Sequence, residues 1–342
     1  MTLAPTETFT PHDDAGAFHV NQPERPLLAR VADSIYWSSR YVERAEHTSR
    51  LLWVMSQLLM DVGDLDPVWQ QRQWHGLLEA MEVSEPADDG SPLSERCIRA
   101  LGLDPSVSSS IVACVTHARE NARGVRSEIS AEMWTILNEL FWSLQGGGAD
   151  TQYAESADDY FQRISRASLM YQGAVDQTLD RGHRWHFAQA GKLLERVDVT
   201  CRIIEARVRF LTDAGPHLEA PVRNIHLMGL LRMCCSIEAY RRQHANELGL
   251  MPVVGFLLLE ADHPRSIRYG VEQAWRATEA IRNVAGITGV DPAERALGRL
   301  AARLAYAEAG EILEQGVAGY LAGIRAATGE ANRALHERYF MA

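Results

Sequence analysis

Two Glu-Arg dipeptides, Glu43-Arg44 and Glu195-Arg196, stand inside long segments with the periodicity of amphipathic helices. Around each, further charged side chains follow at spacings of three and four residues, which place them on one helix face. Such a face can form structural ion pairs, bind a charged ligand or lie open to solvent. Structural pairs are favoured, because aromatic and aliphatic residues interrupt the charges. The candidate residues are Glu43, Arg44, Glu46 and His47 in the first segment and Glu195, Arg196 and Asp198 in the second.

A second charged cluster, Arg119-Glu120 with Arg123 and Arg126, lies in a segment expected to be helical over 109–130. The three arginines are spaced to share one face of that helix. Their guanidiniums could bind a phosphate or a carboxylate through paired hydrogen bonds, or could pair with the glutamates of the two Glu-Arg segments. The pairing with those glutamates is the favoured interpretation.

Metal-binding and catalytic motifs give little support for an enzyme. The long helical segments contain no Glu-x-x-His, the pattern of di-iron bundles. His183 and His186 have a spacing that a helix can use for a metal, but no carboxylate follows at a matching distance. The zinc-protease, serine-hydrolase, phosphate-loop and dinucleotide fingerprints are absent from the sequence. We therefore expect this chain to bind no metal and no cofactor, and catalysis by the isolated chain is not indicated.

The composition is that of an ordinary folded protein, with 46% hydrophobic and 23% charged residues among 342. The net charge of −11 disfavours nucleic acid as a partner. Five cysteines without a Cys-x-x-Cys pair fit a reducing cytoplasm better than a disulfide framework. No signal peptide is recognised, and the longest apolar run, Val253–Leu259, is far shorter than the roughly 20 residues that cross a bilayer. The sequence thus predicts a cytoplasmic protein without a membrane span.

Helical periodicity accounts for most of the chain. Residues 1–26 lack any periodicity and are expected to be a disordered tail, with 27–342 as one helical domain. The apolar run at 253–259 is isolated, so a short buried helix is expected there rather than a strand. The predicted fold class is all-α, a bundle of about ten or more helices. Helices are expected near 27–62, 68–81, 92–101, 109–130, 131–145, 151–180, 185–213, 223–248, 265–286, 292–328 and 331–341.

A weak internal repeat links the two Glu-Arg segments. Residues 40–52 align without gaps on 192–204, with four identities where about one is expected by chance. Hydroxyl residues also open a helix in both parts of the chain, at Ser109-Ser110 and at Ser266. Either the domain consists of two duplicated halves, 27–148 and 151–342, or two similar amphipathic helices arose independently. Duplication would bring the two Glu-Arg motifs to related places, facing one another.

Several blocks carry a resemblance to a known family, namely 28–37, 40–46, 118–123, 129–134 with 137–138, 194–200, 238–242, 256–259 and 264–266. Through them the sequence resembles the bacterial alpha-E domain family over nearly all of 27–340. Two departures, the segment before Leu27 and Ser108 in place of the usual proline, touch only loops or ends. The resemblance carries over no catalytic residue. The positions that match the family's charged motif are Glu43, Arg44, Glu46, Arg119, Glu120, Arg123, Glu195 and Arg196.

The resemblance implies a wholly helical protein encoded beside, or fused to, a circularly permuted ATP-grasp protein, often with a transglutaminase-like protease. It therefore implies a system that makes, modifies or trims a peptide or amide bond. We expect a helical accessory subunit that binds the ATP-grasp protein or its peptide or amine substrate, while ATP and Mg²⁺ come only with that partner. The alternatives are a standalone enzyme that uses paired carboxylates and arginines in an interhelical cleft for acyl transfer or amide chemistry, and a purely structural scaffold.

This hypothesis assigns roles to the charged residues. A carboxylate, or the glutamates themselves, would be held by Arg119, Arg123 and Arg126. An amine would be received by Glu43, Glu46, Glu195 and Asp198.

Overall fold

The computed structural model describes residues 27–61, 67–214, 218–245 and 247–341, which form fifteen α-helices and no strand. The predicted all-α class is confirmed, and the predicted tail at 1–26 lies outside the described residues. The first seven helices are α1 (Ala29–Asp61), α2 (Pro67–Ala80), α3 (Leu93–Ile98), α4 (Ile111–Gly124), α5 (Ala131–Leu144), α6 (Gly148–Glu155) and α7 (Ala157–Thr178). The others are α8 (His183–Ala214), α9 (Ala220–Met233), α10 (Ile237–His244), α11 (Leu250–Leu259), α12 (Ile267–Val284), α13 (Pro292–Ala305), α14 (Ala309–Gln315) and α15 (Val317–Leu335).

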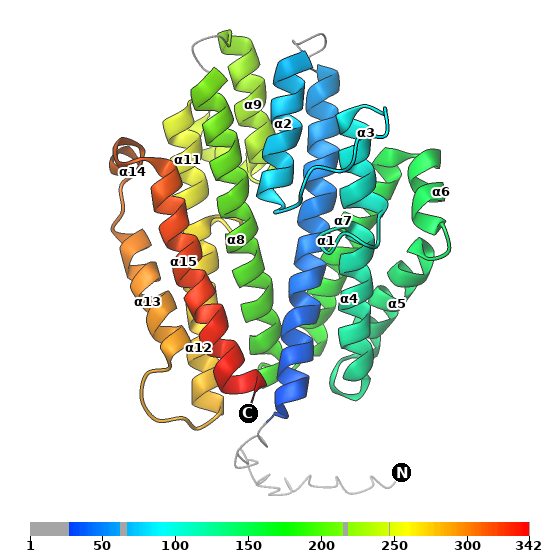
Figure 1. The fold of residues 1–342 in the computed structure, drawn as a ribbon. Helices are drawn as coiled ribbons and strands as arrows, with labels where there is room; N and C mark the ends of the chain where they lie inside the picture. Colours follow the sequence, from blue (N-terminus) through cyan, green and yellow to red (C-terminus); the bar gives the residue numbers. More distant parts are fainter. Residues whose placement is uncertain (1–26, 62–66, 215–217, 246, 342) are drawn as a thin grey trace, which may run out of the picture.

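The long helices α1 and α8 pack side by side in the centre of the molecule and run in the same direction (Figure 1). Their contacts follow the same order along both helices, since Gly191 lies against Tyr36 and, further along, Arg196 binds Glu43. A Cβ atom at position 191 would overlap the carbonyl oxygen of Tyr36, so glycine is required for this close approach. The polar side chains of the two helices can therefore meet directly.

The helices that surround α1 and those that surround α8 pack in the same arrangement. Helices α4 and α7 pack on α1, with α5 against both, while α12 and α15 pack on α8, with α13 against both. Helix α2 packs on α8 and helix α9 packs on α1, so each central helix also contacts a helix from the other part of the chain. This order repeats when the chain is divided between α7 and α8. A division at 148–151, as the sequence suggested, would separate α6 and α7 from α5, which both contact.

Equivalent helices begin in equivalent ways. The Ser110 hydroxyl accepts a hydrogen bond from the Ala113 N–H at the start of α4, over 3.1 Å. The Ser266 hydroxyl accepts one from the Tyr269 N–H at the start of α12, also over 3.1 Å. Both hydroxyl caps expected from the sequence are thus present.

Backbone breaks divide some of the predicted helices. The helix expected over 109–130 ends at Gly124, because Val125 leaves the helical conformation (φ −131°, ψ 30°). Ser156 is extended between α6 and α7, and Gly316 has a φ of 96° between α14 and α15. The run at 253–259 lies within the buried helix α11, as expected. Across the described ranges, no helix combines the length and apolar character that crossing a membrane requires.

The core is made of two apolar clusters stacked along the central helices. One cluster includes Val42 and Leu194 with apolar residues that precede them on α1 and α8. The other includes Ala45 and Val197 with apolar residues that follow. The two Glu-Arg dipeptides fall at the junction, so a layer of charged side chains separates two apolar layers.

Candidate functional site

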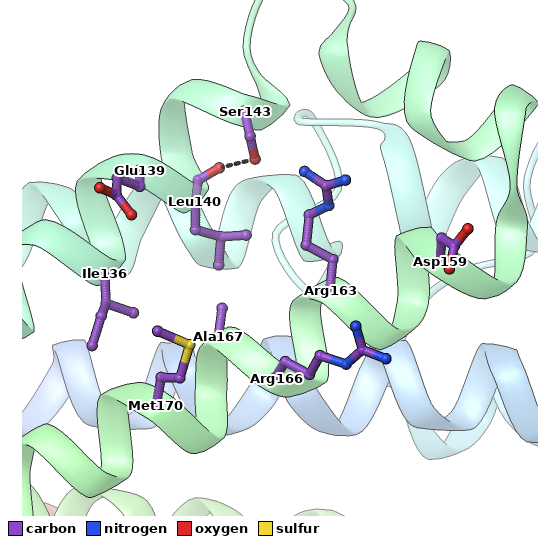
Figure 2. A pocket seen from close by; sticks show the side chains of 9 residues that line it. All are labelled: Ile136, Glu139, Leu140, Ser143, Asp159, Arg163, Arg166, Ala167 and Met170. Carbon is purple, nitrogen blue, oxygen red and sulfur yellow. Dashed lines mark hydrogen bonds between the residues drawn. The ribbon is translucent and has the colours of Figure 1, made fainter.

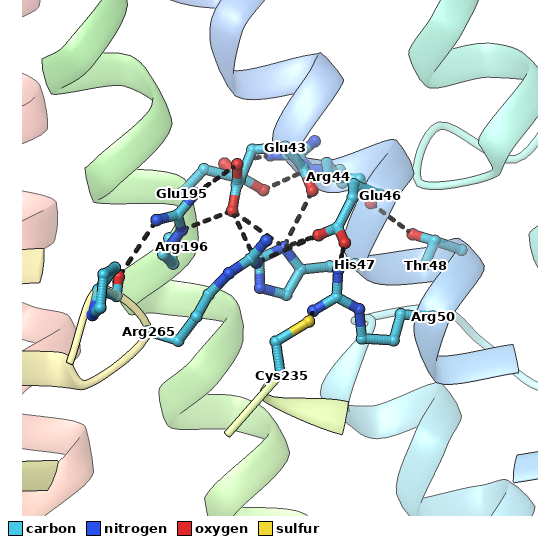
Figure 3. A network of polar contacts seen from close by, with 11 residues as sticks. Glu43, Arg44, Glu46, His47, Thr48, Arg50, Glu195, Arg196, Cys235 and Arg265 are labelled. Atoms are coloured by element: carbon cyan, nitrogen blue, oxygen red, sulfur yellow. Dashed lines mark hydrogen bonds and ion pairs between the residues drawn. The ribbon is translucent and has the colours of Figure 1, made fainter. Parts of the chain in front are cut away.

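The two Glu-Arg dipeptides bind each other across the α1–α8 interface (Figure 3). Arg196 donates from Nε to Glu43 Oε1 over 2.7 Å and from Nη2 to Glu43 Oε2 over 3.0 Å. Arg44 donates in the same way to both oxygens of Glu195, over 2.6 and 3.0 Å. Both pairs are bidentate, the geometry in which arginine binds a carboxylate most strongly. The two motifs therefore face each other as reciprocal interhelical ion pairs.

Further arginines complete this cluster. Arg40 donates from Nε to Glu195 over 2.8 Å, and Arg265, just before α12, lies 3.3 Å from Glu43 and 3.2 Å from Glu46. Arg50 pairs with Glu46 and with the Cys235 sulfur. Arg50 and Arg265 were not candidates from the sequence, although Arg265 lies in one of the blocks of resemblance. We call the following residues the Glu-Arg network: Arg40, Glu43, Arg44, Glu46, His47, Arg50, Glu195, Arg196 and Arg265.

The carboxylates of the network are removed from solvent, with 1% exposure for Glu43 and 0% for Glu195. Burial alone would raise the pKa of Glu43, but Arg196, Arg265 and His47 outweigh it and hold that pKa well below its usual range. For Glu195, Arg40 and Arg44 likewise outweigh burial and lower the pKa to about 2. A general acid or base needs a pKa near the working pH, so these glutamates are unsuited to that role.

Glu43, Glu46 and His47 offer three possible metal-binding atoms that lie within 4.8 Å of one another. However, Arg265 already donates to both carboxylates, and His47 Nδ1 lies 2.9 Å from the Glu43 carbonyl oxygen. Five guanidiniums face three carboxylates in the network, so a cation would meet an excess of positive charge. This donor set is therefore arranged for arginine rather than for a metal.

Asp198 lies apart from the network, although it belongs to the second motif. Arg325 on α15 donates to it over 3.0 Å, and Arg202 on α8 lies 2.9 Å from its other oxygen. Asp198 thus joins α8 to α15 and not to α1. A single amine site made by the four predicted carboxylates does not agree with this geometry, because each of them is bound by guanidiniums of the same chain.

The Arg119 cluster also lies away from the Glu-Arg network. Arg119 and Arg123 both pair with Glu120 of their own helix, Arg123 over 2.7 Å. The guanidiniums of Arg119 and Arg126 each lie 5.1 Å from the ring centre of Trp134 on α5. The expected pairing with the glutamates of the Glu-Arg helices is therefore wrong. The physical reason is that these arginines project toward α5 and solvent, and that α4 ends before Arg126.

A cavity of about 330 Å³ adjoins the network between α8 and α12. Arg196 forms part of its wall, and among the candidate residues only Arg196 lines it. One feature of the sequence could have pointed to this cavity, because Lys192 is the single lysine in a sequence with 33 arginines. We call this space the Lys192 cavity, and its lining residues are Asp176, Trp185, His186, Gln189, Lys192, Leu193, Arg196, Pro264, Tyr269, Gln273, Arg276 and Ala277.

A larger cavity of about 450 Å³ lies between α5 and α7 (Figure 2). Arg163 and Arg166 of α7 line it together with Asp159 and Glu139, and apolar side chains such as Met170 complete the lining. A cavity of about 370 Å³ lies at the corresponding place between α13 and α15. Neither space is lined by a residue of the Glu-Arg network or by another candidate from the sequence.

Comparison with known proteins supports the same assignment as the resemblance. The chain is 23% identical over 335 residues to uncharacterised proteins from Mycobacterium bovis and Mycobacterium tuberculosis. The match covers 91% of this chain but 36% of each relative, so the chain spans about a third of their length. No solved structure matches it significantly. A family model described as an alpha-helical domain with a conserved ER motif, Alpha-E, matches residues 27–340, and the chain therefore belongs to the Alpha-E family.

Proposed function

We propose that this chain is a helical substrate-binding subunit of an ATP-dependent system that forms or modifies peptide or amide bonds. One observation carries the proposal. Arginines of the same chain already pair with every central carboxylate, while an open cavity lies directly beside them. Glu43 and Glu195 hold α1 against α8, and the Lys192 cavity shares Arg196 with them. The network thus fixes Arg196 in the wall of a binding site and does not itself act as a reacting group.

The relatives support a division of labour between this domain and another one. They contain the domain as about a third of a longer chain, so in those proteins it accompanies further sequence. The resemblance points to an ATP-grasp protein as the companion, with a transglutaminase-like protease as a further partner. ATP and Mg²⁺ are then brought by the ATP-grasp protein, and the Alpha-E chain presents the substrate.

A standalone enzyme that uses the paired carboxylates is not favoured by the geometry. Both glutamates are buried, and arginines hold their pKa values low, so neither takes up or releases a proton near neutral pH. A purely structural scaffold would explain the network but would leave the Lys192 cavity without a role.

The test is isolation of the tagged chain from its own cells at low salt, because an ionic interface is screened at high salt. We expect an ATP-grasp protein in near-stoichiometric amount. Mixing the two purified chains should give ATP-dependent amide formation that neither shows alone. If the chain is isolated alone and turns over substrate by itself, the proposal is wrong. If the partner binds but amide formation does not require the Alpha-E chain, the scaffold explanation replaces it.

A further inference from the structure

Lys192 is the single lysine in a chain that otherwise places 33 arginines wherever it needs a cation. The difference matters chemically, because a guanidinium stays protonated in proteins whereas an amine can lose its proton and become a nucleophile. If the residue only had to bind an anion, arginine would do so as well as lysine or better. The identity of this residue therefore points to a use of the free amine.

The surroundings of Lys192 leave its amine available. It lies in the wall of the Lys192 cavity, and within the described part of the chain it makes no hydrogen bond or ion pair. The Arg276 guanidinium at the same cavity is exposed and likewise has no ion-pair partner among the described residues. The one acid of the wall, Asp176, accepts hydrogen bonds from Trp185 and Gln189 over 2.9 and 3.0 Å.

The internal repeat shows how this availability arises. Lys192 aligns with Arg40, which is bound to Glu195. The equivalent partner for Lys192 would be Glu43, but Arg265 takes that place at 3.3 Å. In one part of the chain the position thus holds an arginine that forms an ion pair, and in the other it holds a lysine that faces a cavity.

The environment also makes the ammonium group of Lys192 easier to deprotonate. Burial, with a further contribution from the positive charge of Arg196, lowers the pKa of Lys192 to about 8 from a usual 10.5. At neutral pH the nucleophilic, uncharged fraction is then roughly 300-fold larger than for an ordinary lysine.

We propose that the Lys192 cavity binds a small acyl phosphate and that Lys192 accepts its acyl group. The uncharged Nζ attacks the carbonyl carbon, a C–N bond forms, the C–O bond to phosphorus breaks, and inorganic phosphate leaves with the electron pair. The amine releases one proton to solvent. Arg276 and Tyr269 line the same cavity and would bind the phosphate, and the size of the cavity suits a small acid rather than a nucleotide. This inference rests on the proposed function in one respect, since ATP-dependent activation is what supplies an acyl phosphate.

The test uses the full chain alone, with acetyl phosphate as the probe and peptide mass spectrometry as the readout. An exposed lysine introduced by Arg333→Lys serves as the internal reference. We expect saturable acetylation of Lys192 that inorganic phosphate inhibits, at a rate roughly 100-fold above that of the introduced lysine. Lys192→Arg should abolish the labelling at position 192.

A second pair of measurements separates a binding site from a merely reactive amine. Arg276→Gln should slow acetylation by acetyl phosphate about tenfold, but should leave acetylation by the neutral reagent p-nitrophenyl acetate unchanged. The proposal is overturned if labelling is not saturable, if Arg276→Gln affects both reagents equally, or if Lys192 reacts no faster than the introduced lysine. Saturable trapping of pyruvate on Lys192 by borohydride, without reaction toward acetyl phosphate, would overturn it in favour of a carbonyl site.

These outcomes are independent of the partner. Acetylation of Lys192 in a chain that captures no ATP-grasp protein would contradict only the proposed function. An active complex in which Lys192→Arg changes nothing would contradict only this inference.

Discussion

Glu43 and Glu195 each bind the arginine that follows the other in sequence, Arg196 and Arg44 respectively. This exchange ties α1 to α8 at the level where the two apolar clusters of the core meet. Because both carboxylates are buried, their replacement affects the whole fold and not only a local surface.

Glu43→Gln should lower the free energy of unfolding by about 3 to 5 kcal/mol, because it leaves the Arg196 guanidinium buried without its counter-charge. Urea unfolding followed by circular dichroism measures this change. Arg123→Ala is the matched control. Arg123 is 64% exposed and pairs only with Glu120 among the described residues, so its loss should cost less than about 1 kcal/mol. Equal effects of the two variants would contradict a stabilising role for the network.

The stability of the protein should fall in acid. The pKa of Glu195 is lowered to about 2 from a usual 4.5, so its contribution is complete above the unfolded value and is lost as the pH falls through the folded value. The pKa of Glu43 is lowered in the same direction. We therefore expect the urea midpoint to decrease steadily from about pH 5 to about pH 2. A midpoint that stays constant over this range would show that the two carboxylates do not stabilise the fold.

Gly191→Ala should disrupt the central helix pair, because its Cβ would overlap the Tyr36 carbonyl oxygen, a backbone atom that cannot move aside easily. We expect a loss of about 3 kcal/mol in urea unfolding. Gly173→Ala in α7 is the control. A Cβ at Gly173 meets nothing within 4 Å, so this change should stabilise the helix by about 0.5 to 1 kcal/mol. Similar effects of the two variants would mean that α1 and α8 are not in such close contact.

Lys192→Met should make the protein more stable at neutral pH. Burial lowers the pKa of Lys192 to about 8, so the protonated amine opposes folding, and the penalty fades as the pH rises from about 8 toward 10.5. We expect a gain of about 1 to 3 kcal/mol near pH 7 and a smaller one near pH 10. Differential scanning calorimetry at the two pH values measures it, with Arg333→Met as a surface control. A loss of stability in Lys192→Met would indicate that the amine has a structural partner.

The purified protein should contain no stoichiometric transition metal. Glu43 and Glu46 are bound by arginines, so a metal ion would have to displace a guanidinium from each carboxylate. Elemental analysis by mass spectrometry after incubation with Zn²⁺ or Mn²⁺ tests this. One equivalent of metal that disappears in His47→Gln would show that the site binds a metal after all.

The spacing of charged residues predicted which faces of α1 and α8 meet, but not every contact they make. The repeat at 40–52 and 192–204 pointed to motifs facing each other, and the ion pairs between Glu43 and Arg196 agree with that expectation. Arg265 could not be assigned, because its contacts to Glu43 and Glu46 depend on where the loop before α12 comes to lie. The pairing of Arg50 with Glu46, four residues earlier on the same helix, follows the spacing rule and was missed. The Arg119 cluster was misassigned for a related reason, since spacing shows that residues share a face but not which neighbour the face contacts.

The sequence by itself determined the helical class, the family and most helix positions. It also determined that each central helix carries an apolar face and a charged face. These follow from local periodicity and capping, which depend on residues a few positions apart. Only the tertiary structure decided that the charged layer is closed by arginines from three different segments and that Lys192 is left facing a cavity. The reason is that burial and charge pairing depend on distances between residues more than 150 positions apart, which no local pattern encodes.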